Sequence, residues 1–264
     1  MIWKHSTEAL VLVVAMTAWS GACRKRSPAL PATPPPAGPL AEAATARLDA
    51  DSHDPAHPPI DCPLSKQGIP LDHLRPFQDT AKYIAFLERS DRAAWQKPDE
   101  VVAALGLRGT ETVVDLGAGS GYFSFRLAKA LPQGKVIAAD TEPEMLRHIH
   151  HRAMSEGMRN IEVKIIKPAD PAVSADADLV FLCDVLHHVP DRLAWLAKLR
   201  GQMKSGARLA LLEFKEGKLP EGPPEAAKIP RAQLLDLVTR AGFRLSTEPK
   251  ALLPYQVFLI LSKP

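Results

Sequence analysis

Residues 113–123 read Val-Val-Asp-Leu-Gly-Ala-Gly-Ser-Gly-Tyr-Phe, and this stretch decides the fold. It begins in an apolar strand over residues 112–116 and turns through three glycines toward a helix over residues 122–131. Glycine lets the backbone approach a ligand where a Cβ atom would collide, and the free N–H groups of the helix start point toward the same place. The next strand ends at Asp140, about 20 residues later, where a strand–helix–strand nucleotide site carries its ribose-binding group.

The glycine spacing separates two classes of nucleotide. Dinucleotide folds read G-x-G-x-x-G and bind a pyrophosphate, whereas this chain reads G-x-G-x-G with Asp115 two positions before the first glycine. A carboxylate there repels a pyrophosphate and suits S-adenosylmethionine (SAM), whose sulfonium and amino groups are cationic. Residues 115–123, D-L-G-A-G-S-G-Y-F, resemble motif I of class I SAM-dependent methyltransferases. The alternative interpretation is a glycine-rich turn without a cofactor.

The resemblance implies a set of cofactor-binding residues. Asp115 is expected at the methionine amino group, and Asp140 is expected to accept hydrogen bonds from both ribose hydroxyls because a carboxylate offers two acceptor oxygens. Further cofactor-binding residues are expected in the glycine motif and after the fourth strand. They are Gly117, Ala118, Gly119, Gly121 and Tyr122 of the motif and Asp184 after the strand.

Two further residues are expected near the adenine. Met145, with Glu142 nearby, is the candidate for the apolar residue that covers one adenine face, although plain helix packing would explain it equally well. Asp170 is the candidate for the acid that follows the third strand, in a Lys-Pro-Ala-Asp stretch whose proline departs from the commonest family pattern.

The segment 184–190, Asp-Val-Leu-His-His-Val-Pro, resembles the loop that lies beside the transferred methyl group in this family. Histidine titrates near neutral pH, so His188 and His187 are the candidates for a general base. The alternative is a role in loop packing, since methyl transfer from a sulfonium depends chiefly on in-line positioning.

The segment 92–98, Arg-Ala-Ala-Trp-Gln-Lys-Pro, resembles a stretch that precedes the core of some small class I methyltransferases. It places Arg92 and Gln96 at the carboxylate end of the cofactor, with Tyr83 in the same pocket on the substrate side. Trp95 is expected to be a core residue.

Strands alternate with helices along residues 71–264, which predicts an α/β fold with a doubly wound, seven-stranded, mostly parallel sheet and N-terminal helices. The last two strands have no helix between them and form a hairpin, as the resemblance implies. Gly242 is expected to cap the last helix, and Cys183 to end a buried strand. The expected strands are residues 112–116, 135–139, 161–166, 178–183, 208–213, 243–246 and 256–261, and the expected helices are residues 99–105, 122–131, 143–156, 191–199 and 231–241.

The N-terminus has a different character. Residues 1–23 read as a secretory signal, because an apolar run is followed by small residues and Cys23, an ending that resembles a bacterial lipoprotein signal. An uncleaved anchor is the first alternative, in which Arg24, Lys25 and Arg26 would hold the domain in the cytoplasm, where SAM is made. The second is a wrongly assigned start codon, which would leave a cytoplasmic enzyme. Residues 24–70 are rich in proline and alanine and predict a disordered linker. The spacing of the potential metal ligands in this linker matches no established zinc-binding pattern, so no metal site is predicted. These ligands are His53, Asp54, His57, Asp61 and Cys62.

Composition narrows the function further. The chain has 264 residues and a net charge of +3, which gives no argument for a nucleic-acid partner. Residues 214–230 are short and proline-rich and leave no room for a separate substrate domain. The sequence therefore predicts a SAM-dependent methyltransferase acting on a small molecule, with membrane attachment through the N-terminus. A non-catalytic SAM- or nucleoside-binding envelope protein and an NAD-dependent oxidoreductase are the alternatives, and Asp115 with the glycine spacing disfavours the second.

Overall fold

The computed structural model describes residues 77–264. The predicted signal segment, the linker with its histidines and cysteines, and the predicted domain start at Leu71 lie outside the described residues. Within residues 77–264, no helix combines the length and the hydropathy needed to cross a membrane. The same residues contain no group of three or more His, Cys, Asp or Glu side chains placed to hold a metal ion.

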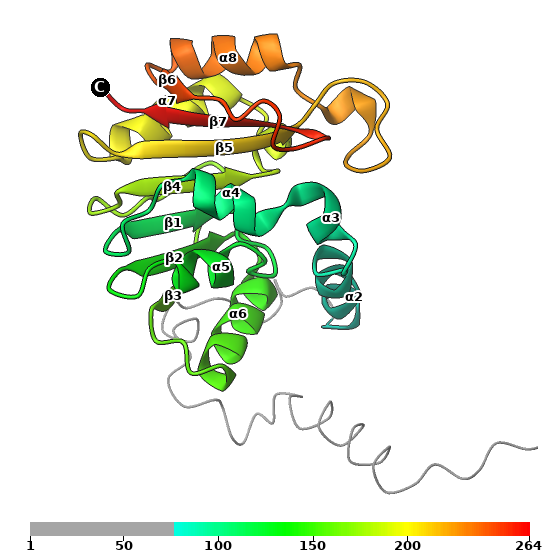
Figure 1. Cartoon of the computed structure of the whole chain (residues 1–264), viewed down its shortest axis with the longest axis vertical. Helices are drawn as coiled ribbons and strands as arrows, with labels where there is room; N and C mark the ends of the chain where they lie inside the picture. The colour runs from blue at the N-terminus through cyan, green and yellow to red at the C-terminus, as the bar shows by residue number, and fades with distance from the viewer. Residues whose placement is uncertain (1–76) are drawn as a thin grey trace, which may run out of the picture. The chain divides into compact units, whose positions relative to one another are not determined.

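The centre of the fold is a sheet of seven strands in the order β3-β2-β1-β4-β5-β7-β6 (Figure 1). Strands β1 to β5 pair in parallel, and β7 runs antiparallel to both of its neighbours. This confirms the predicted fold class and the C-terminal hairpin. The strands are β1 (Thr112–Leu116), β2 (Lys135–Asp140), β3 (Ile161–Ile165), β4 (Leu179–Cys183), β5 (Arg208–Phe214), β6 (Arg244–Thr247) and β7 (Gln256–Ser262).

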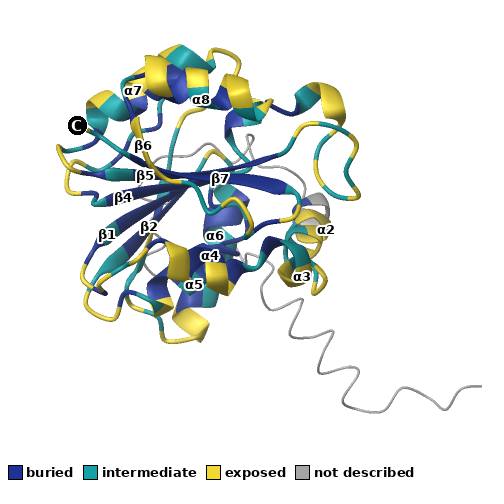
Figure 2. Cartoon of the chain, turned by 45° about the horizontal axis from the view of Figure 1, so that its top comes forward, coloured by how far each residue is buried: buried dark blue, intermediate teal, exposed yellow. Residues whose placement is uncertain are grey.

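Helices cover both faces of the sheet (Figure 2). On one face lie α4 (Pro98–Ala104), α5 (Ser124–Lys129) and α6 (Pro143–Ser155), and on the other lie α7 (Arg192–Gln202) and α8 (Arg231–Arg240). Two short helices, α2 (Phe77–Leu87) and α3 (Arg92–Gln96), precede this core, and two 3-10 turns, η3 (Leu186–His188) and η4 (Glu225–Ala227), lie in loops.

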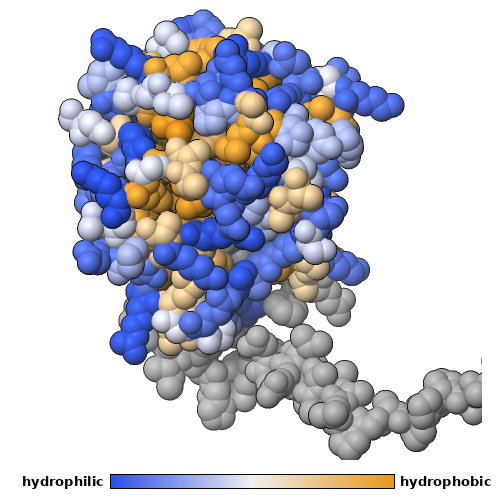
Figure 3. Space-filling model, viewed as in Figure 1, coloured by the Kyte–Doolittle hydropathy of each residue, from blue (hydrophilic) through white to orange (hydrophobic). Residues whose placement is uncertain are grey.

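Alternating side chains of each strand supply the two halves of the core. Val113 packs with the α4–α5 layer and Val114 with the α7–α8 layer, because successive strand residues point to opposite faces. Strand β4 is a continuous apolar run because both of its faces are covered. On the outer face seen in Figure 3, hydrophilic residues surround smaller hydrophobic areas.

The predicted helix boundaries differ from the observed ones by at most three residues. Helix α5 begins at Ser124 and not at residue 122, because the glycine turn continues through Tyr122 and Phe123. Helix α7 runs on to Gln202, and its start is capped by the Asp191 side chain, which accepts a hydrogen bond from the Ala194 N–H at 3.1 Å. Gly242 follows α8 with φ 91°, as predicted for a glycine that ends a helix.

Candidate active site

A cavity of about 720 Å³ opens at the carboxyl ends of the parallel strands. The ends of β1, β2 and β4 form its floor, and α2, α3 and the segment after β5 contribute the remaining walls. Because β1 lies between β2 and β4, the helices that follow β1 and β4 cover opposite faces, and open α/β sheets bind ligands at this point. The volume lies within the range of small-molecule and cofactor sites.

The glycine turn forms one side of the cavity. The N–H groups of Gly117 and Ala118 donate to the Ala139 carbonyl at 2.7 and 3.1 Å, which attaches the turn to the end of β2. Gly117 has φ 79°, and a Cβ atom there would lie 2.3 Å from Cγ2 of Val185, in the loop after β4. Glycine is therefore required where the two loops meet.

Gly121 differs from the other two glycines. A Cβ atom on it would lie 2.8 Å from the Phe125 ring and 2.9 Å from the Ile149 side chain, and the residue is not part of the cavity lining. The structure thus assigns Gly121 to the packing of the turn against α5 and α6, whereas Gly117, Ala118 and Gly119 line the cavity.

Asp115 is a buried carboxyl group in the floor of the cavity, with 3% of its surface exposed. Burial raises its pKa to about 7, and the nearby Asp140 charge raises it further, against a hydrogen bond from Ser124 Oγ at 2.6 Å. No basic side chain forms an ion pair with Asp115 among the described residues. A cationic ligand group at this carboxyl would stabilise its ionised form.

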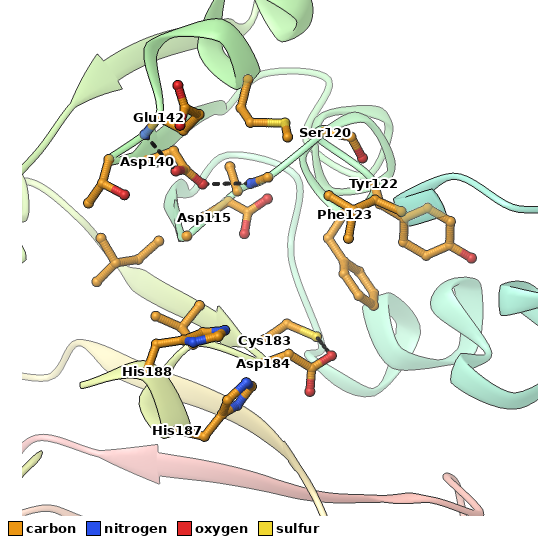
Figure 4. Close-up of a pocket in the computed structure, with 18 of the residues that line it drawn as sticks. Asp115, Ser120, Tyr122, Phe123, Asp140, Glu142, Cys183, Asp184, His187 and His188 are labelled. Carbon is orange, nitrogen blue, oxygen red and sulfur yellow. Dashed lines mark hydrogen bonds between the residues drawn. The ribbon is translucent and has the colours of Figure 1, made fainter. Parts of the chain in front are cut away.

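Asp140 ends β2 and presents its carboxylate to the cavity (Figure 4). Its Oδ2 accepts a hydrogen bond from the Gly119 N–H at 2.8 Å, and its Oδ1 accepts one from the Glu142 N–H at 2.9 Å. These bonds fix the orientation of the carboxylate and leave lone pairs for a diol. Met145, in the first turn of α6, is buried and lines the cavity beside it.

Asp170 lies apart from the cavity, contrary to the prediction. Its Oδ1 accepts hydrogen bonds from Gln202 Nε2 at 2.8 Å and from the Ala172 N–H at 3.1 Å, and it forms an ion pair with Lys198 at 3.2 Å. An isolated bridge between Lys167 and Asp170 turns the chain back toward α7. Ile166, Lys167 and Pro168 line the cavity in its place.

A polar network lies beneath the loop after β4. Asp184, in the left-handed region with φ 58°, accepts hydrogen bonds from Gln256 Nε2 at 2.7 Å and Gln96 Nε2 at 3.3 Å. Burial, with repulsion from Glu213, raises the pKa of Asp184 to about 6. Gln96 is fully buried and does not line the cavity; its amide also donates to Gln256 Oε1 at 3.2 Å. Gln96 thus links α3 to β7 and to the residue after β4 from below the cavity. It does not lie on the substrate side of the cavity, where the sequence analysis expects it.

His187 is held by a buried carboxylate that the sequence analysis did not include. Its Nδ1 lies 2.8 Å from Oε2 of Glu213, whose Oε1 accepts the Leu186 N–H at 2.6 Å. Burial alone would lower the pKa of His187, but the Glu213 carboxylate outweighs it and the pKa is raised. The sequence signal for Glu213 is a charged residue inside the apolar run of β5.

His188 is the more exposed of the two histidines, and its ring centroid lies 4.1 Å from that of His187. Burial, followed by the neighbouring His187 charge, lowers the pKa of His188. Both rings line the cavity across from Asp115 and Asp140 (Figure 4). His188 is therefore neutral near pH 7 and able to accept a proton, whereas the Nδ1 atom of His187 interacts with the Glu213 carboxylate.

Arg92, Tyr122 and Tyr83 also line the cavity. The Arg92 guanidinium lies 4.0 Å from the Tyr122 ring centroid, its Nη1 donates to the Leu87 carbonyl at 2.6 Å, and its Nε donates to Gln96. Tyr83 is 47% exposed on α2. Trp95, expected in the core, is part of the cavity lining as well.

Comparison with known proteins adds to this geometry. Residues 114–209 match the family model described as a methyltransferase domain. This match covers less than half of the chain. The fold is the Rossmann-like fold of SAM-dependent methyltransferases. It is similar to that of a SAM-dependent methyltransferase from Aquifex aeolicus, with a TM-score of 0.65 and 24% sequence identity. The comparison covers 70% of this chain and 99% of that one. The magnesium protoporphyrin IX methyltransferase of Synechocystis PCC 6803, solved with bound S-adenosylhomocysteine, has a TM-score of 0.55 and 21% identity over 71% of this chain and 94% of its own.

Curated relatives are similar over the same domain. The trans-aconitate 2-methyltransferase of Azoarcus sp. (strain BH72) is 29% identical over 136 residues, which are 52% of this chain and 50% of the relative. An uncharacterized methyltransferase of Mycobacterium bovis is 31% identical over 124 residues, which are 47% of this chain and 61% of the relative. The chain thus spans about half the length of the first of these relatives. The domain implies SAM as its cofactor.

Proposed function

We propose that this chain transfers a methyl group from SAM to a small molecule. The observation that carries the proposal is the pair of carboxyl groups on one cavity: Asp115, buried without an ion-pair partner among the described residues, and Asp140, oriented by two backbone N–H groups. A ligand with a cationic amino group and a ribose diol satisfies both. The family match over residues 114–209 supports the same ligand.

The chain's own residues have separate tasks in this proposal. Asp115 binds the amino group, Asp140 binds the ribose hydroxyls, and Met145 packs against the adenine. When bound, SAM supplies an electrophilic methyl group and leaves as S-adenosylhomocysteine with the bonding electron pair. The residues after β4 lie beside the reacting atoms, where they position the acceptor in line with the methyl group.

Within this proposal, His188 takes the proton of the acceptor. Its lowered pKa leaves a neutral imidazole at pH 7, and it borders the same cavity as the cofactor residues. His187 shapes the loop through Glu213, whose carboxylate raises the pKa of the imidazole. A small acceptor is favoured because the segment between β5 and α8 is short and itself closes part of the cavity.

Calorimetry on the full chain tests the cofactor. SAM and S-adenosylhomocysteine should bind, and NAD should not. Asp140→Ala should lose about 1.5–3 kcal/mol of SAM binding free energy, the size of hydrogen bonds to a charged group. Asp236→Ala, an exposed site on α8, is the matched control and should bind SAM like the parent. Unchanged affinity in the Asp140 variant would remove that residue from the ribose site, and binding of NAD in place of SAM would support an oxidoreductase.

Turnover tests the base and separates the enzyme from a module that merely binds SAM. His188→Ala should lower turnover by about 100-fold or more with SAM affinity retained. The parent's pH–rate profile should have a limb below the usual histidine pKa of about 6.5, and the variant should lose it. His187→Ala should act mainly on stability. Near-normal turnover of His188→Ala would mean that proximity alone drives transfer.

We further propose that residues 1–23 address the protein as a lipoprotein signal and that residues 24–70 are a tether. Incorporation of labelled palmitate that is lost in Cys23→Ser would support this. Unprocessed protein that stays in the cytoplasmic fraction would instead support the uncleaved anchor or the wrongly assigned start. A protein that starts near Leu71 should melt cooperatively if the boundary is right.

A further inference from the structure

One wall of the cavity is aromatic. Tyr83 and Phe86 of α2 stack with centroids 6.3 Å apart and planes inclined by 10°, and they are 47% and 57% exposed. Trp95 of α3 packs against Phe214 at the end of β5, with centroids 5.6 Å apart. All four side chains line the cavity, on the walls formed by α2, α3 and the end of β5. Exposed rings that face a cavity are available to a ligand.

The cations of this wall already have partners. The Arg89 guanidinium forms ion pairs with Glu221 and, at 3.2 Å, with Asp91, and it lies 4.6 Å from the Phe86 ring centroid. Arg92 has no carboxylate partner among the described residues; its guanidinium contacts the Leu87 carbonyl, Gln96 and the Tyr122 ring, and the sequence analysis places it at the carboxylate end of the cofactor.

Apart from these two arginines, the only Lys or Arg among the described lining residues is Lys167. Lys167 follows β3, on the side of the sheet where the adenosine is proposed to bind. With the cofactor carboxylate at Arg92, as the sequence analysis expects, a carboxylate acceptor would meet no unmatched guanidinium beside the aromatic wall.

One donor on the aromatic wall has no partner. Nε1 of Trp95 is buried and makes no hydrogen bond among the described residues. Buried polar groups are nearly always hydrogen-bonded, and an exception calls for an explanation. A ligand oxygen that accepts from this N–H would satisfy it.

We propose that the acceptor subsite takes a neutral aromatic molecule with a weakly acidic hydroxyl group, a phenol, held by this wall. The inference rests on the proposed function and names its substrate class. The ring packs against Phe86, Trp95 and Phe214, and a neutral ligand oxygen accepts from Trp95 Nε1. The reacting hydroxyl passes its proton to His188 as its oxygen gains the methyl group of SAM.

The Arg89–Glu221 pair gives the subsite its preference for neutral acceptors. As long as Glu221 matches the guanidinium, a carboxylate gains little there and would have to displace an existing ion pair. Glu221→Gln removes one of the two carboxylates paired with Arg89, leaves the Asp91 pair, and keeps the guanidinium in place. This substitution should raise the relative kcat/KM for carboxylates by about tenfold, the size of one charge-assisted hydrogen bond.

The test uses the full chain with labelled SAM and two panels of acceptors, guaiacol with other neutral phenols, and trans-aconitate with malonate. SAM binding is measured by calorimetry on the same samples. Methyl transfer should favour the phenols by at least about tenfold in kcat/KM. Trp95→Phe, which keeps the ring and removes the N–H, should raise the KM for guaiacol by about 2- to 10-fold, as expected for one lost hydrogen bond, with SAM affinity unchanged. Tyr255→Phe is the matched control. The Tyr255 ring packs against the Trp95 ring, with centroids 5.9 Å apart, but Tyr255 does not line the cavity.

The outcomes separate the two levels of the proposal. Failure to bind SAM would overturn the proposed function itself. SAM binding together with a preference for trans-aconitate or malonate, or with no transfer to any phenol, would overturn the phenol subsite and leave the cofactor site standing. An unchanged KM for guaiacol in Trp95→Phe would remove Trp95 from the subsite.

Discussion

The two halves of the cavity are built in different ways. On the β1–β2 side, the decisive contacts span short stretches of chain: Ser124 bonds Asp115 nine residues away, and the Gly119 N–H bonds Asp140 over 21 residues. On the β4–β5 side they are long-range: Gln256 reaches Asp184 over 72 residues, and Gln96 reaches Gln256 over 160. The first half is specified by a local motif and its backbone, and the second by side chains that the sheet brings together.

The largest effect is expected in the long-range half. Glu213→Ala removes the buried partner of His187 and the acceptor of the Leu186 N–H. Breaking a buried ion pair from one side costs about 3–5 kcal/mol, and chemical denaturation should show a loss of that size. Because the pKa of His187 is raised in the fold, the contribution of this pair is fully present below the unfolded pKa and is lost as the pH rises through the folded one.

The control for this variant is Glu162→Ala, which breaks an exposed pair with Lys135. It should cost about 0–1 kcal/mol. Equal losses in the two variants would mean that the buried network adds no more stability than a surface pair.

The next effect belongs to the glycine turn. Gly117→Ala forces a Cβ atom to within 2.3 Å of Val185 at a backbone φ of 79°. The left-handed conformation costs about 1–2 kcal/mol and the overpacking about 1–3 kcal/mol, and thermal melting with SAM calorimetry should show lost stability and lost binding.

Two comparisons sharpen this result. Gly106→Ala, at φ 58° with no atom within 4 Å, should show the conformational cost alone. Val185→Ala should partly rescue Gly117→Ala, because it removes the colliding Cγ2 atom. No rescue would mean that backbone strain, and not the contact between the two loops, requires the glycine.

A smaller effect is expected from pH. The pKa of Asp115 is about 7, so an ammonium ligand must meet a carboxyl that is mostly protonated at pH 5.5. SAM affinity should rise about tenfold from pH 5.5 to pH 7, a range below the α-amino pKa of about 7.7–8.0 in which the ligand charge changes little. Asp115→Asn should flatten this slope. A slope that survives in that variant would assign the titration to another group of the cavity, Asp184, whose pKa is about 6, or one of the two histidines beside it.

The smallest effect is expected at Asp170. Its carboxylate faces Gln202 and Lys198 and not the cavity. Asp170→Ala should leave SAM affinity within about twofold of the parent, as for surface substitutions away from a site. A large loss would restore the adenine contact that the sequence analysis expected.

Sequence reasoning reached the first half of the site because each of its parts has a local signature. Asp115, Gly117, Gly119 and Asp140 follow from one strand–turn–helix unit and the strand that comes next, and they meet in the cavity as the spacing requires. Gly121 has the same signature and a different task, since the atoms that forbid its Cβ belong to Phe125 and Ile149. A glycine pattern reports a close approach, but it does not report what approaches.

The second half had no such signature. Glu213 and Gln256 are polar residues beside the apolar runs of β5 and β7, and nothing local indicates that they face the loop after β4. Gln96 was assigned to the cavity from a resemblance and is instead beneath it, where the amide joins Asp184 and Gln256. The resemblance predicts Asp170 near the adenine, but a one-turn reversal of the chain places it toward α7.

The sequence by itself determined the order of strands and helices, the sheet, and the backbone of the glycine turn, because these depend on side-chain periodicity and on residues that are neighbours in the chain. The tertiary structure decided which carboxyl groups are buried, which are paired and which pKa values shift. Those properties depend on distances between side chains and on exclusion of water, and both are set when distant strands meet in one sheet: Asp115 has a pKa of about 7 because the closed fold desolvates it, with Asp140 nearby.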